Sequence, residues 1–186
     1  MVYVGALGLE HAKGVLLYTN LSAKLANDGF DCTILKASFF ARNFKNYEWE
    51  NITQRGVTYV AAGRGKVAFI DVEDVAAVAA MVLTQEGHSK QSYQLTGPET
   101  LYYFDAAEAL SEVLGRLIVY PNLSPAGYTN TLKMAGAPDF IAPYMIGVYS
   151  LIANNYVDYV THDVLHITGK NPASLKQVLQ QDFAAV

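Results

Sequence analysis

The sequence predicts an α/β fold in a single domain, with a parallel sheet and its helices first and a mostly helical region after it. Two short apolar segments, 2–7 and 31–37, flank an amphipathic stretch, and this order is typical of a β-α-β unit with parallel strands. Hydrophobic residues make up 52% of the 186 residues and charged residues only 16%, which indicates a large apolar core. From Ser124-Pro125 onward the apolar periodicity is mainly helical.

The remaining elements follow from local signals. Leu17, Leu21 and Leu25 recur at helical spacing before Gly29, so a helix is expected over 13–27. Asp71 precedes a helical repeat and is expected to cap that helix. The other expected elements are a helix or loop plus helix over 39–54, strands at 57–60, 67–70, 92–95 and 117–120, and helices at 104–114, 125–135, 138–157 and 174–183.

Charge and composition exclude several classes of function. The net charge of −4 comes from scattered residues, and no block of Lys and Arg is present to follow a nucleic-acid backbone. No apolar run approaches the roughly 20 residues that span a bilayer, and the first residues do not resemble a signal peptide. The single Cys32 lies in an apolar run and has no partner for an intramolecular disulfide. We therefore expect a cytoplasmic protein without nucleic-acid or membrane partners.

The glycines after the first strand are a poor match to a dinucleotide-binding loop. Such a loop needs G-x-G-x-x-G between strand and helix, whereas this chain has Gly5, Gly8 and Gly14. The second strand also lacks the acidic residue that binds the ribose, and Lys36 near its end is more compatible with a 2′-phosphate. These observations weaken a phosphate-binding role without excluding it.

The order and spacing of several segments resemble a known family. The strings VYVGALG, GFDCTILKASFFARNF, FIDVEDVAAVAA and LTGPETLYYFDAAEALSEVLGR are similar to the NmrA-like branch of the atypical short-chain dehydrogenases, a group of NAD(P)H-dependent quinone reductases and NADP-sensing regulators. The resemblance implies that 2–7 is the fifth strand of a Rossmann-like sheet. It also implies that the nucleotide-binding part lies before Met1, in a truncated gene or a natural short form. The expected fold is then a reduced Rossmann-like parallel sheet with helices (1–115) and a helical, substrate-cap-like region (116–186).

The same resemblance implies that the catalytic positions are substituted. The family serine falls on Gly5, the tyrosine on Gly14 and the lysine on Tyr18. Only Tyr18 retains a group that donates a proton, and a phenol needs a neighbouring cation to act as a base near neutral pH. A tyrosine on the helix surface or in the core is the structural alternative for Tyr18.

The loop after the second strand is the candidate ligand site. By resemblance, Ala37, Ser38, Phe39 and Phe40 pack over the nicotinamide of a cofactor, and Phe39, Phe40 and Asn43 open the substrate pocket. Aromatic side chains suit a flat apolar ring such as a quinone, because ring stacking requires a face and few hydrogen bonds. The alternative is that Phe39 and Phe40 belong to the core.

The other polar residues do not indicate a catalytic or metal site. His162 and His166 are one helical turn apart with Asp163 between them, but a metal site usually needs a third ligand and a supporting shell, so no metal is expected. Asp71 and Asp74 match family positions, and helix capping and loop fixation are their expected roles.

Two functional hypotheses remain. The first is a non-catalytic member of the NAD(P)-binding family that binds a small aromatic ligand or a partner, with no cofactor expected for this chain alone. The alternative is an NAD(P)H-dependent oxidoreductase of quinone-like or small aromatic substrates, which uses NADP(H) or NAD(H). Without the preceding strands the sheet has an exposed edge, so we also expect a homo-oligomer that covers this edge.

Overall fold

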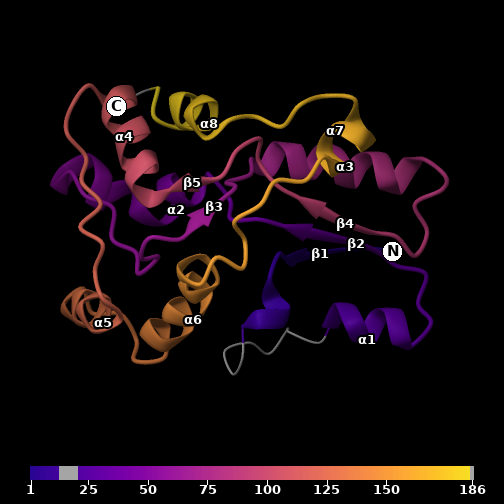
Figure 1. The fold of residues 1–186 in the computed structure, drawn as a ribbon, viewed down its shortest axis with the longest axis horizontal. Helices are drawn as coiled ribbons and strands as arrows, with labels where there is room; N and C mark the ends of the chain where they lie inside the picture. Colours follow the sequence, from indigo (N-terminus) through magenta and orange to yellow (C-terminus); the bar gives the residue numbers. More distant parts are fainter. Residues whose placement is uncertain (13–20, 185–186) are drawn as a thin grey trace.

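The structure, a computed structural model, describes residues 1–12 and 21–184 (Figure 1). In the first half the elements are β1 (Val2–Ala6), η1 (Leu9–His11), α1 (Leu21–Asn27), β2 (Thr33–Ala37), α2 (Asn43–Glu50), the π-helical turn η2 (Asn51–Arg55), β3 (Lys66–Val67), α3 (Val72–Thr84) and β4 (Ser92–Leu95). In the second half they are β5 (Leu101–Tyr102), α4 (Tyr103–Leu114), α5 (Pro125–Met134), α6 (Ile141–Ala153), α7 (Asp163–Thr168) and α8 (Leu175–Asp182).

The main sheet is parallel, as the β-α-β pattern predicts. Its strand order is β1-β2-β4, and Val4 lies opposite Leu35, which in turn lies opposite Tyr93. In Figure 1, α3 runs along one side of this sheet and α1 along the other. A separate antiparallel pair, β3 with β5, leads into α4. The α/β class with a reduced parallel sheet and a mostly helical second half is confirmed.

Two apolar clusters form the core. One lies between the sheet, α3 and α7, where Leu35, Val78 and Leu95 are fully buried and Val164 nearly so. The larger cluster joins α2, α4, α6 and α8 and includes fully buried Leu110. Because α6 belongs to this second cluster, its position relative to the ends of β1 and β2 is set by core packing.

Asp71 caps α3, which confirms the expectation from the sequence. Its carboxylate accepts a hydrogen bond of 3.2 Å from the backbone N–H of Glu73, in the first turn. We expect Asp71→Ala to lower the free energy of unfolding by about 1 kcal/mol, because an N–H of the first turn loses its acceptor. Urea denaturation measures this loss. Asp71→Asn keeps an acceptor and should lose clearly less; equal losses in both variants would contradict the capping role.

The prediction of strands at 57–60 and 117–120 is wrong, because neither segment forms a regular strand. A single parallel bridge joins Val57 and Val119, and no ladder continues from it. The reason lies at Tyr59, whose backbone N–H donates to the carboxylate of Glu48 at 2.9 Å instead of to a strand carbonyl. A side chain therefore occupies the place where a ladder would have continued.

Three further boundaries differ from expectation. The expected strand at 67–70 is reduced to β3, with one more parallel bridge from Ile70 to Phe40. The helix expected over 138–157 is shorter and ends at Ala153, two residues before Asn155 takes a left-handed backbone conformation with φ of 59°. The short helix α7 was not expected. The predicted helix over 13–27 is described only from Leu21 onward.

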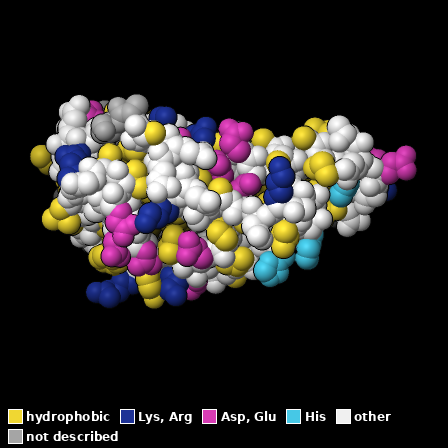
Figure 2. Space-filling view, turned by 90° about the horizontal axis from the view of Figure 1, so that it is seen from above, with side chains coloured by type: hydrophobic (Ala, Val, Ile, Leu, Met, Phe, Trp, Pro, Cys, Tyr) yellow, Lys and Arg dark blue, Asp and Glu magenta, His cyan; other side chains and the backbone are white. Residues whose placement is uncertain are grey.

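The surface agrees with the scattered charges of the sequence. Figure 2 shows acidic and basic side chains interspersed with apolar ones on the face in view, without a continuous basic area. Within residues 1–12 and 21–184, no helix has the length and apolar character needed to cross a membrane.

Candidate functional site

The candidate site lies where β1 and β2 end. Ala6 and Ala37, the last residues of the two strands, are directly opposite each other. The N–H of Leu7 donates to the carbonyl of Ala37 at 2.8 Å, so the two strand exits stay together. In open parallel sheets, ligands bind outside the carboxyl ends of the strands.

A cavity of about 370 Å³ opens at this edge. All five residues singled out in the loop after β2 line it: Ala37, Ser38, Phe39, Phe40 and Asn43. The opposite walls come from β1, the residues just after it and α6, namely Tyr3, Val4, Gly5, Ala6, Leu7, Leu9, Tyr144, Val148 and Leu151. The structure thus brings the predicted residues together on one cavity, and the walls are mainly apolar.

One polar atom of this cavity has no partner. The side chain of Ser38 is 4% exposed, and its hydroxyl makes no hydrogen bond with any residue that the structure describes. A buried hydroxyl without a partner costs free energy, so such groups usually meet a ligand or an ordered water.

A second cavity of about 520 Å³ adjoins the first through shared walls. Phe39, Phe40 and Asn43 line both, as do Tyr144 and Val148 of α6. The walls that belong to the second cavity alone are Phe44, Tyr47, Glu48, Thr58, Val60, Phe69, Tyr103, Tyr128, Leu132, Ile141, Met145 and Tyr149. The two cavities together offer a space of the size that small-molecule ligands occupy.

Glu48 is the acidic group of the second cavity. Its Oε2 accepts hydrogen bonds from the N–H of Tyr59 at 2.9 Å and from the amide of Asn51 at 3.4 Å. Burial raises the pKa of Glu48 to about 7, and the hydrogen bonds from Tyr59, Asn51 and Thr58 offset only part of this effect. A carboxyl with this pKa changes its charge near neutral pH.

Tyrosines surround this carboxyl. The rings of Tyr103 and Tyr149 meet edge to face with centroids 6.3 Å apart, and Tyr128 meets Tyr149 at 5.9 Å. Burial, followed by repulsion from Glu48, raises the pKa of Tyr128 to about 12, and the same two causes raise the pKa of Tyr103 well above its usual value. These phenols therefore remain neutral hydrogen-bonding groups near pH 7.

The positions that the resemblance assigns to catalysis are placed only in part. Tyr18 and Gly14 lie outside the described residues. Gly5 is in β1 and lines the first cavity, where a Cβ would come within 3.0 Å of the ring of Tyr3. A glycine at this position supplies no hydroxyl to the cavity.

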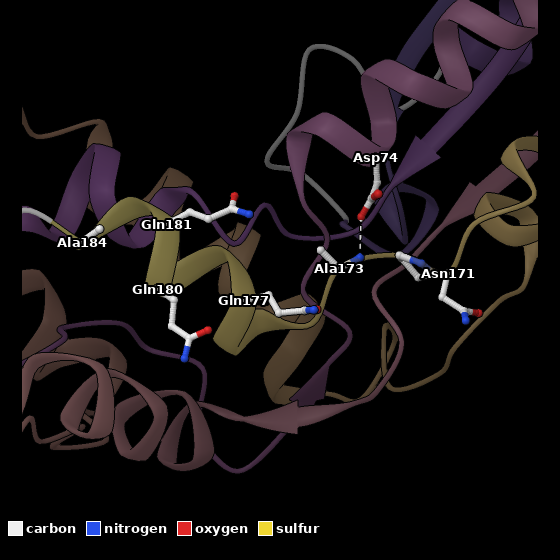
Figure 3. A pocket seen from close by; sticks show the side chains of 8 residues that line it. Asp74, Asn171, Ala173, Gln177, Gln180, Gln181 and Ala184 are labelled. Atoms are coloured by element: carbon white, nitrogen blue, oxygen red, sulfur yellow. Dashed lines mark hydrogen bonds between the residues drawn. The ribbon is translucent and has the colours of Figure 1, made fainter.

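Asp74 fixes a loop, as expected. Its carboxylate accepts a hydrogen bond of 2.8 Å from the N–H of Ala173, and Figure 3 shows this contact beside α8. The hollow around it, of about 650 Å³, carries amide side chains from Gln177, Gln180 and Gln181. Asp74 lies away from both aromatic cavities, since it lines neither.

The histidine pair is also separate from the site. The rings of His162 and His166 are 6.1 Å apart, and the carboxylate of Asp163 accepts the N–H of Gln94 at 2.7 Å. Asp163 thereby joins α7 to β4. In the part of the chain that the structure describes, no cluster of three or more His, Cys, Asp or Glu residues has the arrangement of a metal site.

Glu48, Thr58, Tyr103 and Tyr128 are site residues that the sequence did not predict, whereas Tyr144 and Tyr149 of α6 belong to a run of tyrosines for which a core, a pocket wall or a dimer face was expected. In the sequence Glu48 resembles any polar residue of a helix, and Tyr59, whose N–H donates to it, is eleven positions away. Tyr103 and Tyr128 reach it only through the packing of α4 and α5. The one available signal was the density of aromatic residues in the second half of the chain.

Comparison with known proteins agrees with this geometry. No protein-family model matches the chain. NAD(P)H azoreductase from Xenophilus azovorans is 31% identical over 162 residues, which are 87% of this chain and 56% of that protein. NADPH-dependent quinone oxidoreductase QOR2 from Escherichia coli, solved with NADPH, has a TM-score of 0.85 at 25% identity, over 98% of this chain and 65% of that one. NmrA, a negative transcriptional regulator solved with NAD, has a TM-score of 0.69 at 13% identity over 98% of this chain and 64% of its own, a likeness of fold alone.

The chain thus has a Rossmann-like α/β fold, which it shares with NAD(P)H-dependent oxidoreductases. Together with the shared fold, these relatives agree with the resemblance of the chain to the NmrA-like branch of the atypical short-chain dehydrogenases. The chain spans about half the length of the curated relatives it matches.

Proposed function

We propose that the chain binds a small, flat aromatic or quinone-like molecule at the ends of β1 and β2, as the substrate side of an NAD(P)H-dependent oxidoreductase. The observation that carries the proposal is the convergence of Phe39, Phe40 and Asn43 on the wall between two apolar cavities. Two aromatic rings with few polar groups suit stacking on a planar ligand. The names of the relatives support this substrate class, because one is an azoreductase and another a quinone oxidoreductase.

The cofactor is proposed on the same basis. The QOR2 structure contains NADPH, and hydride transfer to a quinone requires a nicotinamide at the edge of the substrate pocket. Ala37 and Ser38 lie at the carboxyl end of β2, where they would border such a ring. The hydroxyl of Ser38, which has no hydrogen-bond partner among the described residues, would be able to hydrogen-bond the carboxamide of the nicotinamide.

A second candidate is ligand binding without turnover by this chain alone. Gly5 supports it, because the position that the resemblance assigns to a serine has no hydroxyl. The two candidates differ in one measurable property. An oxidoreductase oxidises NADPH when a quinone is added, whereas a binding protein does not.

The experiment is a titration of the full chain with menadione, a small naphthoquinone, followed through intrinsic fluorescence, and then an assay of NADPH oxidation with the same quinone. We expect saturable menadione binding, weakened roughly tenfold in Phe40→Leu because the aromatic face is lost while apolar volume is kept. Quinone-dependent NADPH oxidation would favour the enzyme, and binding without oxidation the non-catalytic candidate. Menadione binding that is absent, or unchanged in Phe40→Leu, would contradict the site.

We also propose self-association through the free edge of β1. This strand is at the end of the order β1-β2-β4, and Val4 is 46% exposed. An edge strand offers unpaired backbone groups to a second copy, and a symmetric pair covers both edges at once. Light scattering at micromolar concentration should give the mass of a dimer, and Val4→Lys should shift it toward the monomer. A clean monomer in the unmodified chain would refute this proposal.

A further inference from the structure

The second cavity contains one acidic side chain and no basic one. Of the residues that line it, all within the described part of the chain, Glu48 alone carries a charge. The other walls are aromatic or aliphatic, apart from the hydroxyl of Thr58 and the amide of Asn43. A carboxyl in such surroundings is costly unless a partner compensates it.

The cations that flank Glu48 on α2 and η2 are engaged elsewhere. Arg42, just before α2, and Lys45, on α2, approach the carboxylate of Asp182 at 3.4 Å and 3.8 Å. Arg55 pairs with Glu50 at 3.3 Å, and Arg116 donates to the carbonyls of Ile52 and Thr53. Across residues 1–12 and 21–184, none of the ion pairs includes Glu48. Its charge is therefore free to meet a ligand.

The groups that face Glu48 are suited to a cation as well. Tyr103 of α4, Tyr128 of α5 and Tyr149 of α6 present aromatic rings and phenols, and no hydrogen bond joins these phenols to a described residue. The Thr58 side chain is 0% exposed, and its hydroxyl lies close enough to Glu48 to lower the pKa of that carboxyl. Aromatic faces attract a positive charge, and a carboxylate adds a charge-assisted hydrogen bond.

We propose that the second cavity binds the ammonium group of an aromatic amine, with the Glu48 carboxylate as counter-ion, while the flat ring of the ligand lies between Phe39 and Phe40. The inference rests on the proposed function, because the ring site is the one described there. It narrows the substrate class to aromatic compounds that carry a positively charged amino group.

The pH sets the strength of this interaction. The pKa of Glu48 is about 7, so the carboxyl is mostly protonated at pH 6 and mostly ionised at pH 8. The facing phenols of Tyr103, Tyr128 and Tyr149 have raised pKa values and stay neutral across this range. A cationic ligand that remains protonated throughout should therefore bind roughly tenfold more tightly at pH 8 than at pH 6.

The test compares two probes with the same ring, 2-naphthylmethylammonium and neutral 2-naphthylmethanol, by isothermal titration calorimetry on the full chain. At pH 8 the cationic probe should bind roughly tenfold more tightly than the neutral one. Glu48→Gln should remove this preference and its pH dependence. Glu50→Gln is the matched control, because it removes an exposed carboxylate of the same helix.

The outcomes separate this inference from the proposed function. If the neutral probe binds but the cationic probe shows no preference at pH 8, the ammonium site is refuted and the aromatic site stands. If neither probe binds, both are refuted. The pH series on the unmodified chain requires no variant, so the inference is tested even if Glu48→Gln folds poorly; an affinity for the cation that is flat from pH 6 to pH 8 would overturn it.

Discussion

Gly65→Ala is expected to lower the free energy of unfolding by about 3 kcal/mol or more, the upper range of overpacking in a core. A Cβ at residue 65 would lie 1.7 Å from the carbonyl oxygen of Ile152, near the end of α6. This oxygen belongs to a helix backbone, and Ile152 itself is fully buried, so neither can move aside at low cost. Chemical denaturation with guanidinium measures the loss.

The same substitution at Gly127 provides the control. Gly127 is in α5, and a Cβ there would meet its nearest neighbours at 3.5 Å, an ordinary contact. Alanine is the better helix former, so Gly127→Ala should gain up to about 1 kcal/mol. If Gly65→Ala were as stable as the unmodified protein, the close approach of Gly65 to α6 would be wrong. The position of Tyr144 and Val148 beside both cavities would then be in doubt.

Glu48→Gln is expected to stabilise the protein at pH 8 by about 1 to 2 kcal/mol, after allowance for solvent screening of a partly exposed group. Burial raises the pKa of Glu48 from its ordinary 4.5 to about 7 in the folded chain. The folded state therefore holds the proton more tightly than the unfolded state does. This contribution to stability is complete below pH 4.5, falls as pH rises through the interval between the two values, and is lost above pH 7.

The pH series makes this prediction specific. Near pH 4 the unmodified protein and Glu48→Gln should have nearly equal free energies of unfolding, and the difference should open between pH 5 and pH 7. Glu50→Gln removes a charge from an exposed pair with Arg55 and should change stability by less than about 1 kcal/mol. A difference between Glu48→Gln and the unmodified protein that stays constant from pH 4 to pH 8 would contradict a raised pKa for this partly buried carboxyl.

The stability cost of Glu48 and its proposed role in ligand binding have the same physical cause. A carboxyl that costs stability at neutral pH and has no cationic partner among the described residues is more easily understood as part of a binding site than of the core. Binding sites commonly contain groups that the fold alone would not favour. The ionised carboxylate of Glu48 thus lowers the stability of the free protein and, in the proposal, raises its affinity for an ammonium group.

The local elements were predictable because their signals are short-range. The cap at Asp71, the cap at Ser124 and the left-handed Gly115 at the end of α4 involve only neighbouring residues, and each is present. The parallel pairing of 2–7 with 31–37 was also predictable, because a strand-helix-strand unit has one favoured geometry. Segments 57–60 and 117–120 were not, because the carboxylate of Glu48 interrupts their pairing at Tyr59.

The site also contains residues that the sequence could predict and residues that it could not. The loop residues 37–40 and Asn43 could be singled out because the end of a parallel strand is where ligand sites form and because the resemblance points there. The acidic cavity could not, since it joins Glu48 of α2 to Tyr103 and Tyr128, which are far away in sequence. Only the packing of α4, α5 and α6 around α2 brings these groups together.

The most direct test of the central claim, that the ends of β1 and β2 form an aromatic ligand site, is a nuclear magnetic resonance titration of the isotopically labelled chain with menadione. The structure predicts saturable shifts at Phe39, Phe40, Asn43 and the facing part of α6, with little change around Asp74 and α8. Shifts that are absent, or that gather in the amide-lined hollow of α8 instead, would contradict the claim.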